Sequence, residues 1–405
     1  MNNGYIALHF TVSVIPDFEI EEANLLKHIR PSGIRKMFAR AQDLKDVISL
    51  GIGMPDLMPP QELLDEMKNQ MSNLRAHGYT LNAGIPSLRE KIVSQYKSVY
   101  NLDFDPNNIV VGAGGTQLLY TSIFAYTNPG DEVLVQDPGF VYYPTIPQFA
   151  KCKTIPLNLD DKFQVDEENL KSSITEKSKL MIINTPGNPT GGVFTHSTLK
   201  MIADLAIDNN ILILSDEVYE FLTFDNRKHY PISELAPDHT VILNSFSKTY
   251  CITGWRMGFA VSNSQLIQPL AKLHPFIVAN PPSLPQYALA NFMGTKADIE
   301  FKVNMRKIME ERRDVVVKEF GKIDGLEMQP IEGSFYAFPR VRSEKYAGEN
   351  RGLEFSEDIF EKTKVVTVAG SEFGESRYEH VRISFGSVNS DMLREAAQRI
   401  IEYSA

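Results

Sequence analysis

Four short apolar segments constrain the fold of this chain more than any other feature. Each ends in turn or polar residues, and helical stretches separate them along the chain: Asn108–Val111, Glu132–Val135, Leu180–Ile183 and Ile211–Leu214. Short runs that are rich in β-forming residues and apolar on both faces are typical of strands covered by helices on each side. Their repetition predicts βα units around a mostly parallel sheet, and therefore an α/β fold. Ligands of such sheets lie beyond the carboxyl ends of the strands, which is where the polar residues stand here.

The pattern changes after Pro285. A long charged helical stretch, Asp298–Phe320, is followed by a region punctuated by Gly and Pro, with strands expected near Ser334–Phe338 and His380–Phe385. This pattern predicts a second, smaller α+β domain. We therefore expect a large domain of residues 48–300 and a small domain made of residues 1–47 and 301–405.

Composition narrows the classes of function. The 405 residues include 41 Lys and Arg against 51 Asp and Glu, and a formal charge of -10 disfavours a nucleic-acid partner. The two cysteines, Cys152 and Cys251, neither build a disulfide framework nor match a structural zinc site, which fits a reducing cytoplasm. No window reaches the roughly 18 apolar residues of a membrane span. We expect a cytoplasmic protein with no membrane and no nucleic acid as partner.

A glycine-rich segment, Gly112–Gln117, stands between an expected strand and an expected helix. Free backbone amides and the helix dipole at such a junction can hold a phosphate, with Gly115 and Thr116 as the expected contacts. The segment does not fit a dinucleotide fingerprint, because that motif would need glycine at Gln117, and no Walker lysine follows.

A lysine segment, Ser245–Gly258, follows the apolar strand Val241–Leu243. Lys248 is flanked there by hydroxyl side chains and is followed by Arg256, so the segment offers one nucleophilic amine and several donors for a phosphate. These residue types alone are equally typical of a solvated surface loop.

Two further polar segments close the strands Leu180–Ile183 and Ile211–Leu214. They are Asn184–Gly191, which contains Asn188, and Ser215–Tyr219, which contains Asp216. Taken alone, the first is typical of a rigid turn and the second of a helix N-cap.

In this order along the chain, these motifs resemble the class I and II aminotransferases, the fold-type I family of pyridoxal-phosphate enzymes that is aspartate aminotransferase-like. The resemblance covers most of the chain. One small departure is Cys251, where the family more often has Gly, Ser or Ala. The resemblance implies a large domain with a mostly parallel sheet, a smaller α+β domain, and pyridoxal 5'-phosphate as cofactor, with no metal.

The resemblance also assigns roles at the cofactor. Lys248 is expected to attach the cofactor and to move the proton, Asp216 to face the pyridine nitrogen, and Tyr219 and Asn188 to reach the phenolic oxygen. Phe140 is expected to stack on the ring, although a core phenylalanine is an equally good interpretation. The resemblance further implies that the phosphate is held by Gly115, Thr116, Ser245, Ser247, Arg256 and, from the neighbouring subunit of a homodimer, Tyr79.

The substrate is expected to be bound by Arg382, which alternates with apolar neighbours in the strand His380–Phe385. An inward arginine needs an anionic partner, and the resemblance implies that this is the substrate's α-carboxylate, with contacts from Gly53 and Asn188. The alternative is a structural salt bridge to a nearby Glu.

The expected activity is transfer of an amino group from an L-amino acid, aspartate or aromatic, to a 2-oxo acid such as 2-oxoglutarate. A carbon–sulfur lyase or another lyase or synthase of the same fold would use the same motifs. A non-catalytic regulator is disfavoured, because only about fifty residues precede Gly51, too few for an added DNA-binding domain. Some aspartate-using relatives have a basic residue near the position of Thr116, which argues against aspartate, and a cation such as Arg35 is not placed by the sequence.

Overall fold

The computed structural model describes residues 21–29, 33, 37, 40 and 44–404. It groups the chain into two units, Met1–Arg30 and Pro31–Ala405. The described part of the first unit contains a short 3₁₀ helix, η1 (Leu26–His28). Arg35 lies outside the described residues. All elements below belong to the second unit.

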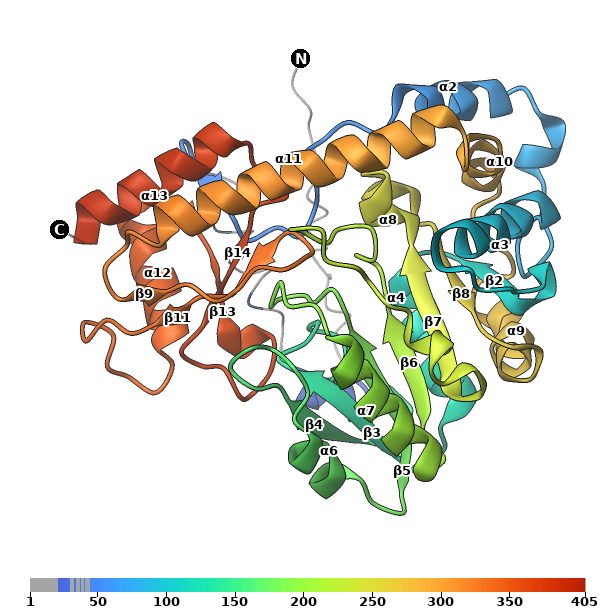
Figure 1. Ribbon diagram of the computed structural model, residues 1–405, viewed down its shortest axis with the longest axis horizontal. Helices are drawn as coiled ribbons and strands as arrows, with labels where there is room; N and C mark the ends of the chain where they lie inside the picture. Colours follow the sequence, from blue (N-terminus) through green and yellow to red (C-terminus); the bar gives the residue numbers. More distant parts are fainter. Residues whose placement is uncertain (1–20, 30–32, 34–36, 38–39, 41–43, 405) are drawn as a thin grey trace, which may run out of the picture. The chain divides into compact units, whose positions relative to one another are not determined.

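A seven-stranded sheet forms the centre of the second unit within the described residues (Figure 1). Its order is β2-β8-β7-β6-β5-β3-β4, and only β8 runs antiparallel to its neighbours. The strands are β2 (Ile109–Gly112), β3 (Glu132–Asp137), β4 (Lys153–Asn158), β5 (Ser178–Asn184), β6 (Leu212–Asp216), β7 (Thr240–Ser245) and β8 (Gly258–Val261). The expected mostly parallel α/β sheet is confirmed, and each of the four apolar segments overlaps a strand.

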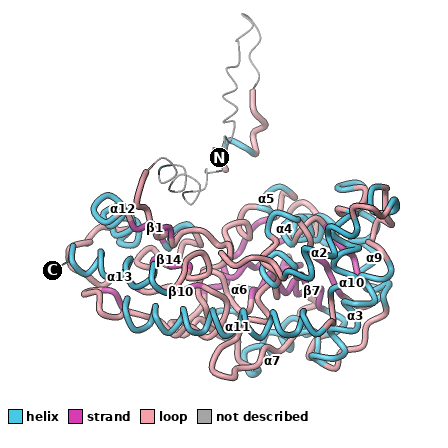
Figure 2. Tube along the Cα trace, turned by 90° about the horizontal axis from the view of Figure 1, so that it is seen from above, coloured by secondary structure: helices cyan, strands magenta, loops and turns pink. Residues whose placement is uncertain are grey.

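Alternate residues of these strands enter separate apolar cores, which explains why the strands are apolar on both faces. In β5, Leu180 and Ile182 pack with residues of α4 and α9, whereas Met181 and Ile183 pack with residues of α7. Figure 2 shows α4 and α5 on one side of the strands and α7 on the other. The helices of this region are α2 (Gln61–Gln70), α3 (Pro86–Tyr100), α4 (Gly115–Tyr126), α5 (Ile146–Phe149), α6 (Glu167–Ser173), α7 (His196–Asp208), α8 (Phe246–Thr249), α9 (Ser264–Val278) and α10 (Ser283–Phe292).

Small antiparallel and mixed strand pairs follow in the carboxyl-terminal part of the chain. Strand β14 lies between β10 and β13, β9 pairs with β11, and β12 pairs in parallel with the early strand β1. The elements are β1 (Ile48–Ser49), β9 (Leu326–Glu327), β10 (Tyr336–Ala337), β11 (Arg340–Val341), β12 (Val365–Val366), β13 (Val368–Ala369), β14 (Val381–Ser384), α11 (Lys296–Phe320), α12 (Arg351–Thr363) and α13 (Ser390–Ser404). This α+β region matches the expected pattern, with the strands β10 and β14 shorter than the segments predicted for them.

Helix α11 spans two apolar cores. Its first turns contribute Ala297 and Phe301 to the core beside α3 and α10, and its later turns contribute Met305 and Phe320 to the core of the carboxyl-terminal region (Figure 1). The expected domain boundary at residue 300 falls inside this helix, and the division into two domains stays a prediction. In the described part of the chain, no helix is long and apolar enough to cross a bilayer.

Short 3₁₀ helices complete the described structure. They are η2 (Leu74–His77), η3 (Pro106–Asn108), η4 (Ile232–Glu234), η5 (Pro237–His239), η6 (Thr253–Trp255) and η7 (Gly370–Glu372).

Gly258 gives a test of how tightly the sheet packs against the glycine-rich turn. A Cβ at this position would lie 2.8 Å from the carbonyl oxygen of Asn244 and 2.9 Å from backbone atoms of Gly114 and Gly115. Because backbone cannot move aside cheaply, we expect Gly258→Ala to lower the free energy of unfolding by about 1–3 kcal/mol, measured by urea denaturation. Gly254→Ala is the control, since a Cβ there meets nothing within 4 Å. Equal losses in the two variants would contradict this packing argument.

Candidate active site

One cavity of about 300 Å³ lies at the carboxyl ends of the central strands. Except for Tyr79, the residues singled out from the sequence all line it: Gly53, Gly115, Thr116, Phe140, Asn188, Asp216, Tyr219, Ser245, Ser247, Lys248, Arg256 and Arg382. Strand β6 ends at Asp216 and β7 at Ser245, because parallel strands present their carboxyl ends along one edge of the sheet. The fold therefore brings these side chains together, while their chemical roles stay predictions.

Lys248 lies on α8, a single helical turn that follows β7 directly. Its Nζ donates a hydrogen bond to the carbonyl oxygen of Gly53. Burial, followed by the positive charges of Arg382 and Arg256, lowers the pKa of Lys248 to about 8. A larger share of this amine is therefore uncharged near neutral pH, which is the state that acts as a nucleophile or accepts a proton.

Asp216 presents its carboxyl group to the same cavity. Tyr143 Oη donates to Asp216 Oδ2 at 2.8 Å, and the backbone N–H of Val218 donates to Oδ1 at 3.3 Å. Burial raises the pKa of Asp216 to about 6, against the opposing effect of these two hydrogen bonds. The chain after Asp216 forms turns rather than a helix, so the helix N-cap alternative is wrong. The carboxyl group is thus held in place while part of it faces the cavity.

The loop after β5 is tied to the loop after β6. Asn184 Nδ2 donates to the carbonyl oxygen of Asp216 at 2.8 Å, and Asn184 Oδ1 accepts from the backbone N–H of Asn188 at 2.8 Å. The Asn188–Pro189 and Thr185–Pro186 peptide bonds of this loop are both cis. Asn184 therefore fixes Asn188 relative to Asp216.

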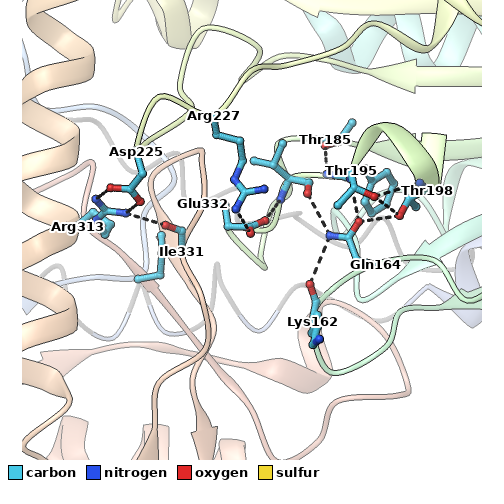
Figure 3. A network of polar contacts seen from close by, with 12 residues as sticks. Lys162, Gln164, Thr185, Thr195, Thr198, Asp225, Arg227, Arg313, Ile331 and Glu332 are labelled. Carbon is cyan, nitrogen blue, oxygen red and sulfur yellow. Dashed lines mark hydrogen bonds and ion pairs between the residues drawn. The ribbon is translucent and has the colours of Figure 1, made fainter. Parts of the chain in front are cut away.

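A polar network holds the backbone that follows the Asn188 loop (Figure 3). Glu332 accepts from the backbone N–H of Val193 at 3.0 Å and pairs with Arg227 at 2.6 Å. The carbonyl oxygen of Val193 accepts from Gln164 Nε2 at 3.0 Å. Figure 3 also shows the hydrogen bonds of Gln164 with Thr195 and Thr198, and of Arg313 with Asp225 and Ile331. In addition, Thr185 Oγ1 accepts from the backbone N–H of Phe194 at 2.9 Å. Distant segments thus hold the backbone that follows the Asn188 loop.

Arg382 is 3% exposed and lies on β14. Its Nη1 donates to Asn188 Oδ1 at 3.0 Å and its Nη2 to the carbonyl oxygen of Gly51 at 2.6 Å, whereas its Nε has no protein acceptor. Arg382 forms no ion pair with a carboxylate of the described residues, so the alternative of a structural salt bridge to Glu is not seen there. A buried guanidinium without an acidic partner is suited to receive an anion from outside the chain.

The glycine-rich turn and the lysine segment meet at the other end of the cavity. Gly114 has a φ of +89°, which residues with a side chain rarely adopt, and a Cβ on it would lie 2.7 Å from the guanidinium of Arg256, so this position favours glycine. Arg256 Nη1 is held by the carbonyl oxygen of Thr253 at 2.9 Å. A cluster of hydrogen-bond donors thus forms here, made of the first amides of α4, the hydroxyls of Thr116 and Ser247, and Arg256. This group is called the donor cluster below.

These features fit pyridoxal phosphate. The donor cluster suits a phosphate, the carboxyl group of Asp216 suits a cationic ring nitrogen, and the amine of Lys248 suits an aldehyde. The space that Gly114 leaves is filled by the guanidinium of Arg256, which is one of these donors.

Phe140 and Tyr79 occupy contrasting environments. Phe140 lines the cavity and contacts the rings of Tyr142 and Tyr143 edge-on, at centroid distances of 4.9 and 5.7 Å. It is half-buried, so it is not purely a core residue. Tyr79 is 92% exposed and does not line the cavity of its own chain.

A buried cluster with two carboxylates begins at Glu217, the residue after Asp216. Glu217, Glu220 and His229 offer ligand atoms within 4.8 Å of one another, the only such set among the described residues. Glu217 already accepts from Ser215 at 3.0 Å and contacts His229 at 2.9 Å, and Glu220 accepts from Tyr100 at 3.0 Å. The carboxylates are thus engaged within the protein, and the expectation that the site needs no metal stays a prediction.

Sequence reasoning missed several residues of the cavity, among them Tyr143, Asn184, Asn244 and Tyr336. Asn184 is the first residue of the segment Asn184–Gly191, so its place in that motif could have predicted its position in the cavity. Tyr143 and Tyr336 had no such signal, because each reaches its partner across a long sequence separation. Tyr336 Oη lies 3.0 Å from Tyr219 Oη and next to Gly53, where a Cβ would lie 2.4 Å from it.

Comparison with known proteins places this geometry in a family. The family model for aminotransferase class I and II matches residues 45–400. The chain is 38% identical to aspartate aminotransferase of Pyrococcus horikoshii over 374 residues, covering 92% of this chain and 94% of that protein. It is 34% identical to aromatic-amino-acid aminotransferase 2 of Thermococcus litoralis over 380 residues, covering 93% and 96%.

A solved structure agrees. Aspartate aminotransferase from Thermus thermophilus with maleate superposes with a TM-score of 0.88 at 27% identity, covering 95% of this chain and 100% of that one. The alternative of a carbon–sulfur lyase or synthase is not supported by these relatives, whose names are those of aminotransferases. The chain therefore belongs to the class I and II aminotransferase family, and it is a pyridoxal-phosphate-dependent aminotransferase of fold type I.

Proposed function

We propose that this aminotransferase takes the amino group of an aromatic L-amino acid, with aspartate as the second candidate donor, and passes it to a 2-oxo acid such as 2-oxoglutarate. The observation that carries the proposal is Arg382, a buried cation without an acidic partner among the described residues, in the same cavity as Lys248 and Asp216. A group of this kind binds a carboxylate bidentately, and every amino acid and 2-oxo acid carries a carboxylate next to its reacting carbon.

The aromatic preference is supported by the side chains around the cavity. Among the described lining residues, the cations are Lys248, Arg256 and Arg382, and none remains for a second substrate carboxylate once these have their roles. Leu119, Phe140, Val141 and Tyr142 supply apolar surface instead. A distal carboxylate without a cationic partner loses the charge-assisted hydrogen bonds that would offset its desolvation.

The proposed roles of the residues follow from their positions. When bound, pyridoxal phosphate supplies an aldehyde that condenses with amines and a ring that accepts electrons from the bonds at the substrate's Cα. Asp216 would face the ring nitrogen, and Asn188 and Tyr219 the phenolic oxygen, while Gly115, Thr116, Ser245, Ser247 and Arg256 would hold the phosphate. Lys248 Nζ would take the proton from Cα, and Arg382 would orient the carboxylate so that this proton faces the amine.

We also propose a homodimer. Tyr79 is almost fully exposed, and Asn82 of the same loop donates to the carbonyl oxygen of Ala279 just after α9, at 2.5 Å. Large apolar side chains are exposed on these two segments: Met71, Leu74, Leu81 and Phe276. Exposed apolar surface of this kind supports an interface through which Tyr79 reaches the neighbouring phosphate site. The native mass in solution tests the proposal of a homodimer.

We further propose a cytoplasmic location, which is supported by the composition of the chain.

The donor preference is tested with a panel of amino acids and 2-oxo acids, read by the 2-oxo acid produced. We expect kcat/KM for L-phenylalanine or L-tyrosine to exceed that for L-aspartate by about tenfold or more. By the same reasoning, 2-oxoglutarate should show a higher KM than an aromatic 2-oxo acid. A preference for L-aspartate would contradict the aromatic assignment.

Lys248→Ala should abolish turnover, because the amine that attaches the cofactor and moves the proton is gone. Borohydride reduction of the wild-type protein followed by peptide mapping should place the adduct on Lys248, and the variant should give none. Lys272→Ala, on α9 and outside the cavity, is the control and should keep both activity and adduct. An adduct on another lysine would refute the assignment.

Asp216→Asn should have opposite effects on stability and on cofactor binding. A carboxyl group whose pKa is raised from 3.8 to about 6 on folding costs stability as pH rises through this window, and the cost is complete above pH 6. At pH 7 the cofactor-free variant should therefore be more stable, by on the order of 1–3 kcal/mol. It should also bind pyridoxal phosphate more weakly, since the negative charge is lost. Urea denaturation and a binding titration measure the two effects. Loss of stability in the variant would contradict the expectation.

A further inference from the structure

The guanidinium of Arg382 lies over two aromatic rings. Its central carbon is 4.7 Å from the ring centroid of Tyr336 and 4.6 Å from that of Phe373. Arginine is weakly hydrated and planar, so aromatic rings stabilise both its charge and its orientation. Tyr336 lines the cavity, whereas Phe373 does not, so Phe373 acts on Arg382 from outside the cavity.

Phe373 is firmly placed. It is 2% exposed, it directly follows η7, and its ring contacts that of Phe338 edge-on at 6.1 Å. Its carbonyl oxygen accepts from the backbone N–H of Gly139, just after β3, at 2.8 Å. The segment Phe373–Ser376 thus lies against the carboxyl end of β3.

Asp137, the last residue of β3, holds the rest of this segment. Its Oδ2 accepts from the backbone N–H of Glu375 at 2.9 Å, and its Oδ1 accepts from Ser376 Oγ at 2.6 Å. Gly374 between them has a φ of +148°, and a Cβ on it would lie 2.1 Å from Asp137 Oδ1. Asp137 is 5% exposed, and its buried carboxylate fastens this segment through a backbone N–H and a hydroxyl, without an ion pair among the described residues.

We propose that Phe373 is a positioning residue for Arg382, and that Asp137 acts through Phe373 by fastening the segment Phe373–Ser376 to the end of β3. The inference rests on the proposed function, in which Arg382 binds the carboxylate of the substrate. Because Arg382 lacks an acidic partner among the described residues, its orientation depends on neutral neighbours, and Phe373 is one of them.

The proposal separates substrate binding from the later steps. Phe373→Leu keeps an apolar side chain and removes the ring, and Asp137→Asn replaces one acceptor oxygen by a donor. Both should raise KM for the amino acid and for the 2-oxo acid by about three- to tenfold, since both substrates use the same arginine. The value of kcat and the dissociation constant of pyridoxal phosphate should stay within about twofold of wild type. The double variant should resemble the more affected single variant, because both changes act through one contact.

Two further variants separate a positioning role of Phe373 from a general loss of stability and from a failure of the proposed role of Arg382. Phe360→Leu is the matched control, because Phe360 is a buried phenylalanine that also lies under an arginine, Arg40, at 5.0 Å, and does not line the cavity. It should lose stability by a similar amount and keep the wild-type KM. Arg382→Lys tests the carboxylate role itself and should raise KM strongly.

If Arg382→Lys leaves KM unchanged, the proposed function of Arg382 fails. If it raises KM while Phe373→Leu does not, only the positioning role of Phe373 is overturned. A rise in KM that Phe360→Leu matches would also overturn it, since general loosening would then be the cause. Should Asp137→Asn not fold, Phe373→Leu alone decides the matter.

Discussion

The parallel register of β5, β6 and β7 is the constraint on which the site depends. Asn184 of β5 pairs with Asp216 of β6, and Asp216 pairs in turn with Leu243 of β7. Because parallel strands end along the same edge, the residues that follow these strands must meet in space. Asn188, Asp216 and Lys248 come from three separate segments and share one cavity for this reason.

The cavity brings together buried ionisable groups whose burial does not favour the stability of the fold. Burial moves the pKa of Lys248 down and that of Asp216 up, and Arg382 is buried beside neutral acceptors. Core residues chosen for stability would pair these charges with one another or replace them by apolar side chains. Perturbed groups gathered in a cavity are typical of sites where an external ligand completes the set of charges.

The carboxyl-terminal region contributes Tyr336 and Arg382 to the lining of the cavity. Strand β14 supplies Arg382, and the segment after η7 supplies Phe373. The long helix α11 joins the two apolar cores, and Asp137 fastens the segment after η7 to the central sheet. The arginine and the lysine thus lie on elements of different regions, and shared apolar cores hold those regions together.

The sequence by itself determined the strands of the central sheet and the residues at their ends. Apolar runs such as Leu180–Ile183 and contiguous motifs such as Ser245–Gly258 are local, so their structure and their chemistry can be inferred from neighbouring residues. Only the tertiary structure decided that Tyr143 donates to Asp216, that Phe373 lies beside Arg382, and that the turn after Asp216 replaces a helix. These contacts join residues far apart in the chain, and no local pattern encodes them because they depend on how the strands and loops pack together.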